Sequence, residues 1–400
     1  MRVLSCLALS ATAAAAAPTA ADLLSSQYAY TFEEFKSDFG KDYADASEHA
    51  ARRAAFHAKL KDIAAHNDAA AGHSWKKGVN QFSDMLDAER ELPRGLARGA
   101  AAARRAAAPV PSSAHLATAF GGDAAALPPS VDWRDHKPPV ISAVKDQGGC
   151  GSCWAFATTE TVESYVALAT GKLPVLSPQQ LVQCAPNADH CGGTGGCQGS
   201  IPEVAAAYIE AHGMTTEWRM PYASYFGDGG SGGSGGAQPA CNATRVDALA
   251  TVHVGGWKKL TPNSYGEVAA ALASVGPLAV NVQANVWSDY ESGVFKGCSN
   301  LTNIEVDHVV QLVGYGTDNG QDYFTIRNSW DVTWGESGFM RMARAGGGGG
   351  APVCGTDPVP LDGTGCTGGP PTQHVCGTCG ILFDVSYPTG AGIGKPTTRA

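Results

Sequence analysis

The residues DQGGCGSCWAF, positions 146–156, decide the fold of this chain. A glycine-rich loop runs here into residues 155–170, which have helical character and end at Gly171. Cys153 therefore lies at a helix N-terminus, where the helix dipole favours a thiolate over a thiol. Upstream, Gln147 has an amide donor for a developing oxyanion, and the backbone N–H of Cys153 is the natural second donor. The stretch thus indicates a reactive thiol.

The first 17 residues have the composition of a secretory signal peptide. Arg2 supplies the positive charge, residues 3–11 are mostly apolar, and residues 13–17 are small and suited to cleavage. We expect removal of residues 1–17 and export through the secretory pathway, to a lysosome or vacuole or out of the cell. No stretch is long and apolar enough to span a bilayer, so we expect no membrane span. The net charge of −9 leaves no broad basic surface for nucleic acid.

The cysteine count supports a free thiol. Of 12 cysteines, Cys6 leaves with the signal peptide, and the odd number that remains predicts five disulfides and one unpaired cysteine in an oxidising compartment. Other uses of Cys150 and Cys153 stay open on the residues alone. A Cys-x-x-Cys redox centre is one alternative, although we find no βαβ pattern beside it. A structural disulfide, or a zinc site completed by Cys376 and Cys379, is another.

Two further motifs supply partners for the thiol. His308 precedes the apolar run 309–315, so its ring can stand at the end of a strand that faces a cleft. A lone histidine in such a place is most often structural. Asn328, close to Trp330, changes this, because an Asn carbonyl can hold an imidazole N–H while an indole shields the pair from water. Nucleophile, base and orienting residue then follow the chain order Cys, His, Asn.

The region before the Cys153 loop has two parts. Residues 30–91 are charged and helical, and two groups of regularly spaced residues stand out in them. The first group is Glu48, Arg52, Phe56, Ile63 and Asn67, and the second group is Gly78, Asn80, Phe82 and Asp84. Residues 92–126 are rich in alanine and have no apolar face, so we expect an exposed linker of the kind that proteases cut.

From residue 127 onward the first half of the chain is helical and the second half is rich in strands, which predicts two lobes with a cleft between them. Ser177 and Pro178 are expected to begin a helix as its N-cap and its first residue. The expected strands are 278–282, 309–315, 322–327 and 339–343. Two glycine-rich insertions, 227–236 and 346–376, interrupt this pattern.

Residues 147–156 resemble the active-site signature of the papain family of cysteine proteases, and the stretches around His308 and Asn328 resemble its other two signatures. The two upstream groups resemble the inhibitory propeptide of the cathepsin L-like branch. The resemblance implies an α+β fold with two lobes, one helical and one β-barrel-like, that flank an active-site cleft and follow a helical prodomain. It also implies a propeptide and linker at residues 18–126, helical over about 28–91, and a mature peptidase at 127–400.

The resemblance also assigns roles to single residues. It implies Cys153 as the nucleophile that forms a thioester, His308 as general acid and base, Asn328 as the orienting residue and Gln147 as an oxyanion donor. The implied substrate-binding residues are Gly199, Ser200, Ile201, Pro202, Asn281, Val306, Asp307, Trp330 and Asp384. The implied disulfides are Cys150–Cys197, Cys184–Cys241 and Cys298–Cys379. Cys191, Cys354, Cys366 and Cys376 are extra, with three possible pairings, and we expect at least one bridge within 354–376.

The chain departs from the family pattern at a few positions. Lys59 stands where Asn is usual, and we expect it to weaken one helix contact at most. Ser200 and Asp331 each stand where Gly is usual, and Asp tolerates a left-handed backbone better than most residues. The resemblance implies that Asp384 lies at the floor of the pocket for the substrate side chain two positions before the scissile bond. We therefore expect basic side chains to be accepted there besides apolar ones.

The expected partners are peptide and protein substrates, and the chain's own propeptide as an intramolecular inhibitor of a monomeric enzyme. The expected chemistry needs no metal and no cofactor. The sequons at Asn242 and Asn300 predict N-glycosylation. Protonation of acids and histidines in the propeptide predicts activation at low pH. Two alternatives remain, a catalytically silent binding or inhibitor protein on the same fold and a thiol–disulfide oxidoreductase that uses Cys150 and Cys153.

Overall fold

The computed structural model describes residues 30–68, 71–86, 89, 127–227, 240–298, 304–344 and 353–395. The expected signal peptide, the linker at 92–126, most of the loop at 227–236 and the Asn300 sequon lie outside these residues. Among the helices that are described, none combines the length and the apolar character needed to cross a membrane.

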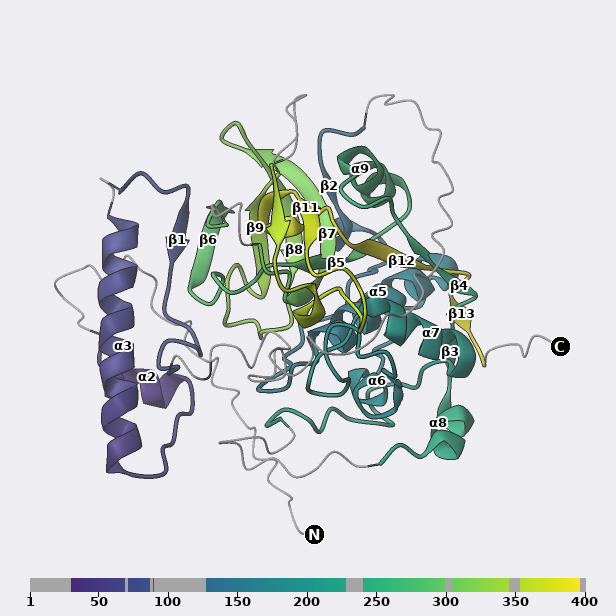
Figure 1. The fold of residues 1–400 in the computed structure, drawn as a ribbon, viewed down its shortest axis with the longest axis horizontal. Helices are drawn as coiled ribbons and strands as arrows, with labels where there is room; N and C mark the ends of the chain where they lie inside the picture. Colours follow the sequence, from purple (N-terminus) through teal and green to yellow (C-terminus); the bar gives the residue numbers. More distant parts are fainter. Residues whose placement is uncertain are drawn as a thin grey trace, which may run out of the picture.

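Figure 1 shows a small N-terminal unit at the left, a large sheet in the centre and a group of helices at the lower right. The N-terminal helices are α2 (Phe32–Asp38) and α3 (Ala46–Asn67). The helical lobe contains α5 (Cys153–Thr170), α6 (Pro178–Cys184), α7 (Pro202–His212) and α8 (Ala243–Leu249), whereas α9 (Tyr265–Ser274) packs on the sheet. Short 3-10 turns are η3 (Trp133–Asp135), η5 (Pro360–Asp362) and η6 (Thr378–Gly380).

The expected helix boundaries are confirmed by their caps. Helix α5 ends at Gly171, whose φ of 69° is the left-handed conformation that glycine adopts without strain. Helix α6 begins after Ser177, whose hydroxyl accepts a hydrogen bond of 3.2 Å from the backbone N–H of Gln180. Pro178 is its first residue, where the missing N–H costs nothing.

One sheet of nine strands runs in the order β1-β6-β9-β8-β7-β5-β12-β4, with β2 paired to β7. Its strands are β1 (Trp75–Lys77), β2 (Val131–Asp132), β4 (Gly256–Lys259), β5 (Leu278–Val282), β6 (Tyr290–Phe295), β7 (His308–Asp318), β8 (Gln321–Arg327), β9 (Phe339–Ala343) and β12 (Val385–Thr389). Two smaller pairs are β3 (Val252–His253) with β13 (Gly392–Ile393) and β10 (Cys354–Asp357) with β11 (Gln373–Cys376).

The four expected strands are confirmed as β5, β7, β8 and β9. The expected β-barrel-like lobe is corrected, because the described strands form an open sheet whose ends are β1 and β4. One end is taken by the N-terminal unit, since β1 pairs antiparallel with β6. A strand from outside the lobe therefore completes this edge of the sheet.

Helix α5 joins the two lobes. Its residues 153–167 are all buried, as in a helix that is packed on every side. It packs against α6 and α7 on one side and against β5, β7 and β12 on the other. Thr158, Thr161 and Ser164 satisfy their buried hydroxyls on backbone carbonyls one turn earlier, at 2.7 to 3.0 Å. Cys153, at the start of this helix, consequently lies at the junction of the lobes.

The N-terminal unit has its own small core and docks through polar contacts. Its core consists of Phe32, Phe35, Phe56, Ile63 and Val79. Asn80 donates from Nδ2 to the carbonyl of Ser288 at 2.6 Å. Lys59 is buried, and its Nζ lies 2.6 Å from Oδ2 of Asp289 in an ion pair whose side chains are 7% and 10% exposed. This ion pair corrects the expectation that Lys59 does no more than weaken a contact.

The described part of the chain contains five disulfides. They are Cys150–Cys197, Cys184–Cys241, Cys191–Cys366, Cys298–Cys379 and Cys354–Cys376. Three of them are the pairs that the resemblance implies, and one lies inside 354–376 as expected. Within the described residues Cys153 is the one cysteine that forms no disulfide. Because Cys150 is bonded to Cys197, and Cys376 and Cys379 are also in disulfides, the structure favours neither the redox pair nor the zinc site.

Candidate active site

The loop before α5 fixes the position of Cys153. The Cys150–Cys197 disulfide and a hydrogen bond of 3.0 Å from Gly151 N to the carbonyl of Cys197 anchor the loop to the helical lobe. Gly148 has a φ of +59°, and a Cβ on it would lie 2.2 Å from the carbonyl oxygen of Tyr225, so this turn requires glycine. Cys153 itself is 3% exposed.

His308 is the first residue of β7, and it lines the same crevice as Cys153. Its Nε2 lies 2.8 Å from Oδ1 of Asn328. Because an amide oxygen only accepts, the imidazole carries a hydrogen on Nε2. The ring of Trp330 lies 4.9 Å from the imidazole, and Trp287 approaches it edge-on at 6.2 Å. Sequence reasoning missed Trp287, because nothing in the local sequence distinguishes it from an ordinary core residue.

Gln147 is held by both ends of its amide. Its Oε1 accepts from the hydroxyl of Ser329 at 2.6 Å, and its Nε2 donates to the carbonyl of Cys150 at 2.9 Å. The Nε2 group carries two hydrogens, and this bond uses one of them. The backbone N–H of Gln147 also donates to the carbonyl of Ser329, at 2.9 Å. The loop that carries the expected oxyanion donor is thereby tied to the residue after Asn328.

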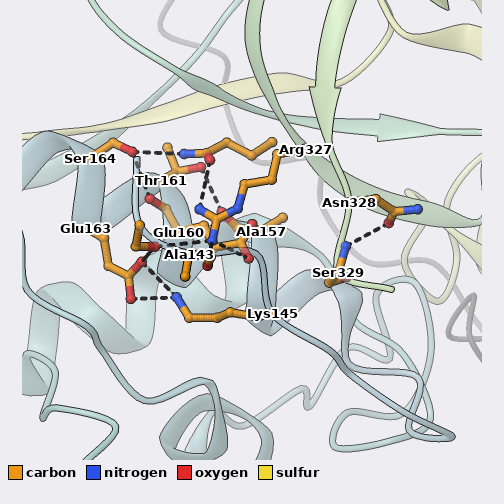
Figure 2. Close-up of polar contacts among 12 residues, drawn as sticks. Ala143, Lys145, Ala157, Glu160, Thr161, Glu163, Ser164, Arg327, Asn328 and Ser329 are labelled. Carbon is orange, nitrogen blue, oxygen red and sulfur yellow. Dashed lines mark hydrogen bonds and ion pairs between the residues drawn. The ribbon is translucent and has the colours of Figure 1, made fainter. Parts of the chain in front are cut away.

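A buried polar network lies behind the site and joins α5 to β8 (Figure 2). Arg327, adjacent to Asn328, is fully buried and lies 3.4 Å from Oε1 of Glu160. Glu163, one turn along α5, lies 2.7 Å from Nζ of Lys145. The network thus fixes the strand end that carries Asn328 against the helix that begins at Cys153.

The crevice at Cys153 contains some of the expected substrate-binding residues and some unexpected ones. Gly199, Ser200, Asn281 and Asp307 line it, whereas Ile201, Pro202, Val306, Trp330 and Asp384 are not among its lining residues. Gly192, Asp362 and Gly363 also line it and were not expected. The sequence offered one indication of these lining residues. The extra cysteines Cys191 and Cys366 each lie within four residues of Gly192 or of Asp362 and Gly363.

Asp384 is buried in an ion-pair cluster. Its Oδ2 lies 2.9 Å from Nζ of Lys259, which also lies 2.5 Å from Oε1 of Glu203. Burial, together with repulsion from Glu203, raises the pKa of Asp384 to about 6. A carboxyl group that is already held by a lysine offers little additional attraction to a basic side chain. The cluster therefore argues against the expected preference for basic side chains at Asp384.

Burial also determines the state of the thiol. It raises the pKa of Cys153 to about 12, although the backbone N–H groups of Val309 and Trp154 act in the opposite direction. Asp307 adds to the increase through its negative charge. The expected lowering of this pKa by the helix N-terminus is thus outweighed in the covered site. Burial therefore favours the neutral thiol over the thiolate in this form of the protein.

Two departures from the family pattern have simple backbone explanations. Asp331 has a φ of 66°, the left-handed conformation expected of it, and its Oδ1 accepts from Thr333 N at 2.9 Å. Ser200 lies outside the left-handed region, whereas Gly199 before it has a φ of 84°. Neither replacement disturbs the turn in which it occurs.

The N-terminal unit reaches the tryptophan that covers His308. Gln81 donates from Nε2 to the carbonyl of Trp330 at 2.5 Å, and its Oε1 accepts from the hydroxyl of Thr333 at 3.0 Å. The ring of Phe82 meets Trp330 edge-on at 5.4 Å. The unit therefore contacts the site directly, besides pairing with the sheet edge.

Comparison with known proteins agrees with this geometry. Residues 127–357 match the papain family cysteine protease, and residues 32–89 match the cathepsin propeptide inhibitor domain (I29). Pro-cathepsin H of Bos taurus is 35% identical over 356 residues, which cover 88% of this chain and 96% of that protein. Digestive cysteine proteinase 1 of Homarus americanus is 33% identical over 324 residues, 78% of this chain and 89% of that protein. The oryzain beta chain of Oryza sativa subsp. japonica is 33% identical over 361 residues, and the match spans 89% of this chain and 65% of that protein.

Solved precursors have the same fold. Recombinant stem bromelain precursor superposes with a TM-score of 0.67 at 29% identity, over 90% of this chain and 97% of that one. Digestive procathepsin L 3 of Tenebrio molitor superposes with a TM-score of 0.66 at 28% identity, over 89% of this chain and 97% of that one. These matches confirm a papain-like fold preceded by a propeptide. The chain therefore belongs to the papain family of cysteine proteases, and it is a zymogen that carries its own inhibitory propeptide domain.

Proposed function

We propose that Cys153 and His308 hydrolyse peptide bonds by acyl transfer through a thioester. His308 takes the proton of the Cys153 thiol, and the thiolate attacks the scissile carbonyl carbon. The backbone N–H of Cys153 and Nε2 of Gln147 hold the resulting oxyanion. The C–N bond then breaks as His308 gives its proton to the leaving amine. A water that His308 deprotonates finally hydrolyses the thioester and restores the thiol.

The hydrogen bond between His308 and Asn328 carries this proposal. It occupies Nε2, so the other ring nitrogen, Nδ1, is the one available for proton exchange with a thiol. Cys153 and His308 line one crevice, which supports their direct cooperation. The indole of Trp330 covers the hydrogen bond between His308 and Asn328. It keeps water away from this bond and maintains the orientation of the imidazole.

The experiment is active-site labelling with an epoxysuccinyl inhibitor before and after acid activation. We expect no labelling of the precursor, labelling of the mature enzyme, and no labelling of the Cys153→Ser variant. Hydrolysis of a fluorogenic dipeptide is expected to be absent in the same proteins that the inhibitor fails to label. Retained labelling of Cys153→Ser would place the nucleophile elsewhere, and a mature protein that neither reacts nor hydrolyses peptides would be the silent binding protein instead.

We also propose the limits of the processed forms. The signal peptide ends at residue 17, the propeptide and linker occupy 18–126, and the mature peptidase begins at 127. The two family matches, which begin at residues 32 and 127, support this division. The mature form is a monomer in the secretory pathway, acting in a lysosome, a vacuole or outside the cell, and the five disulfides are consistent with this environment. Its substrates are peptides and proteins, and the proposal includes no nucleic-acid partner and no membrane span.

Glycosylation is part of the same proposal. Asn242 is exposed at the start of α8, where its Oδ1 caps the helix by accepting from Arg245 N at 3.0 Å. Attachment of a glycan uses Nδ2 and leaves this bond in place. A mass shift that a glycosidase removes, and that Asn242→Gln abolishes, tests it.

A further inference from the structure

Residues 359–366, which we call the strap, connect the two lobes beside Cys153. The strap leaves the sheet lobe from the hairpin of β10 and β11, in which Asp357 lies opposite Gln373. The Cys354–Cys376 disulfide closes this hairpin. Ile304 N donates to the carbonyl of Thr356 at 3.0 Å, so that the hairpin is attached to the segment that leads into β7.

The other end of the strap is attached to the helical lobe. Cys366 is bonded to Cys191, and Gly192 N donates to the carbonyl of Gly365 at 2.8 Å. Just beyond the strap, Thr367 N donates to the carbonyl of Asp189 at 3.0 Å. The strap is therefore fastened at both ends, one end on each lobe.

The middle of the strap fills the space between the walls of the crevice. Asp362 and Gly363 line the crevice together with Cys153 and His308. A Cβ on Gly363 would lie 1.5 Å from the carbonyl oxygen of Val306, which leaves no room for a side chain. A Cβ on Gly192 would lie 2.2 Å from the carbonyl oxygen of Gly363. The strap backbone thus packs against both walls without a gap.

The strap is also stiff. The N–H groups of Gly363, Thr364 and Gly365 all lie within hydrogen-bond distance of the carbonyl of Pro360, at 3.1, 3.0 and 2.7 Å. The hydroxyl of Thr364 donates to Oε1 of Gln373 at 2.7 Å. A turn that is bonded in this way does not yield easily to an incoming peptide.

We propose that the strap closes one end of the substrate cleft and limits the enzyme to peptides with a short segment before the scissile bond. The inference rests on the proposed function and on the substrate-binding roles that the family resemblance implies for Gly199, Ser200 and Asn281, so that the segment before the scissile bond lies along these residues. Since the strap lines the pocket with Asn281, about two residues fit before the chain meets it.

Polar groups at the strap suit the end of a short peptide. Asn281 is 1% exposed and Ser200 is 4% exposed, and both line the crevice. Among the residues that the structure describes, none forms a hydrogen bond with either side-chain polar atom of Asn281 or with the hydroxyl of Ser200. A terminal amine or amide of a short substrate would supply these partners, whereas the side chains of a longer peptide would collide with the strap.

A length series of peptides tests the strap. Fluorogenic peptides with one to four residues before the scissile bond are compared on activated enzyme, with rates divided by the fraction of Cys153 labelled by the epoxysuccinyl inhibitor. The wild type is expected to show a fall in kcat/KM of about tenfold or more beyond two residues. A variant in which a two-residue turn replaces residues 358–372, with Cys191→Ser, is expected to lose this fall, because the Asp357–Gln373 register is that of a hairpin.

Two double variants separate the strap from general effects of losing a disulfide. Cys191→Ser with Cys366→Ser frees the strap from the helical lobe and is expected to weaken the length limit. Cys354→Ser with Cys376→Ser opens the hairpin but leaves this attachment, and it is expected to keep the limit. An active wild type whose kcat/KM does not depend on peptide length would overturn the inference but not the proposed function. A strap-deleted enzyme with the same length dependence as the wild type would do the same. Failure of every enzyme to hydrolyse any peptide would overturn the proposed function and the inference with it.

Discussion

Asn328 positions the proposed general base through a hydrogen bond of 2.8 Å between its Oδ1 and Nε2 of His308. Asn328→Ala removes the acceptor and leaves the imidazole free to rotate beneath Trp330. We expect kcat to fall by roughly 10- to 100-fold with little change in KM, less than the loss of a whole acid–base group. The pH profile of kcat/KM is also expected to shift, which a purely structural role would not produce. Asn328→Gln, which keeps a carbonyl, is the matched control, and an unchanged kcat in Asn328→Ala would contradict the assignment.

Asp384 is the residue at which sequence and structure disagree about specificity. Because Lys259 and Glu203 surround it, we expect Asp384→Ala to alter the ratio of Phe-Arg to Arg-Arg dipeptide hydrolysis by no more than about twofold. The midpoint of thermal unfolding is expected to fall instead, since Lys259 loses a buried partner. A selective loss of Arg-Arg hydrolysis would restore the original expectation that Asp384 receives a basic side chain.

At the scale of elements, the ion pair between Lys59 of α3 and Asp289 just before β6 holds the prodomain in place. Lys59→Ala leaves Asp289 buried without its partner, which costs about 3 kcal/mol, or roughly a hundredfold in docking. We expect the purified variant precursor to activate faster at a fixed mildly acidic pH.

Two further variants serve as controls for Lys59→Ala. Lys59→Ala combined with Asp289→Ala removes both charges and is expected to recover much of the loss. Lys77→Ala breaks the more exposed pair with Asp62, whose side chain is 51% exposed, and is expected to change activation little. If Lys59→Ala and Lys77→Ala activate at the same rate as the wild type, the ion pair does not hold the prodomain.

The same interface contains a pH-sensitive group. His66 of α3 stacks on His73 at 4.0 Å, and its Nε2 lies 3.2 Å from the carbonyl of Trp75 in β1. Burial lowers the pKa of His66, and the charges of His73 and Lys77 lower it further, while Asp62 opposes them. The folded N-terminal unit therefore favours the neutral ring, and the stability of the unit, on which its docking depends, falls as pH decreases from the ordinary histidine pKa of about 6.5 toward the lowered value.

His66→Gln keeps a donor for Trp75 but cannot be protonated. We expect the activation midpoint of the precursor to move to lower pH, measured as the fraction of active enzyme after incubation across a pH series. His57→Gln, on the same helix but exposed, is the control and is expected to behave as the wild type. Coincident midpoints for all three proteins would show that other groups govern activation.

The elements themselves differ in how far local sequence determines them. Strands β5 and β9 lie where apolar periodicity predicts them, and the two ends of α5 follow from a glycine-rich loop and from Gly171. The β10–β11 hairpin and the strap were not predicted. Their residues are rich in glycine and proline, without periodicity, and their position depends on the long-range bond between Cys191 and Cys366. Lys259, paired with Asp384, was missed for the same reason, since partners 125 residues apart leave no local sign.

At the scale of the whole molecule, the network of Figure 2 makes the stability of the lobe contact depend on pH. Burial raises the pKa of Glu160 to about 7, from an ordinary 4.5. Between these values the folded state binds more protons than the unfolded state, so the free energy of unfolding falls as pH rises through this window. We expect a loss on the order of 1–3 kcal/mol from this residue.

Denaturant unfolding tests this in a Cys153→Ser background, which prevents self-digestion. Glu160→Gln resembles the protonated side chain, so its unfolding free energy is expected to lie near that of the wild type at pH 5 and to vary less between pH 5 and pH 7.5. Glu163→Gln, in the neighbouring pair with Lys145, is the comparison for loss of a buried carboxylate. Parallel pH curves for wild type and Glu160→Gln would rule out this role for Glu160.

The pairing of β1 with β6 has a consequence beyond inhibition. When the prodomain leaves, the part of β6 (Tyr290–Phe295) that pairs with β1, at Tyr290, Ser292 and Gly293, becomes an exposed sheet edge. Such an edge can pair with a strand of another molecule, and this association increases with protein concentration. We therefore expect the precursor to aggregate less than the mature enzyme. Light scattering by the protein solution is expected to rise on maturation unless the enzyme is diluted.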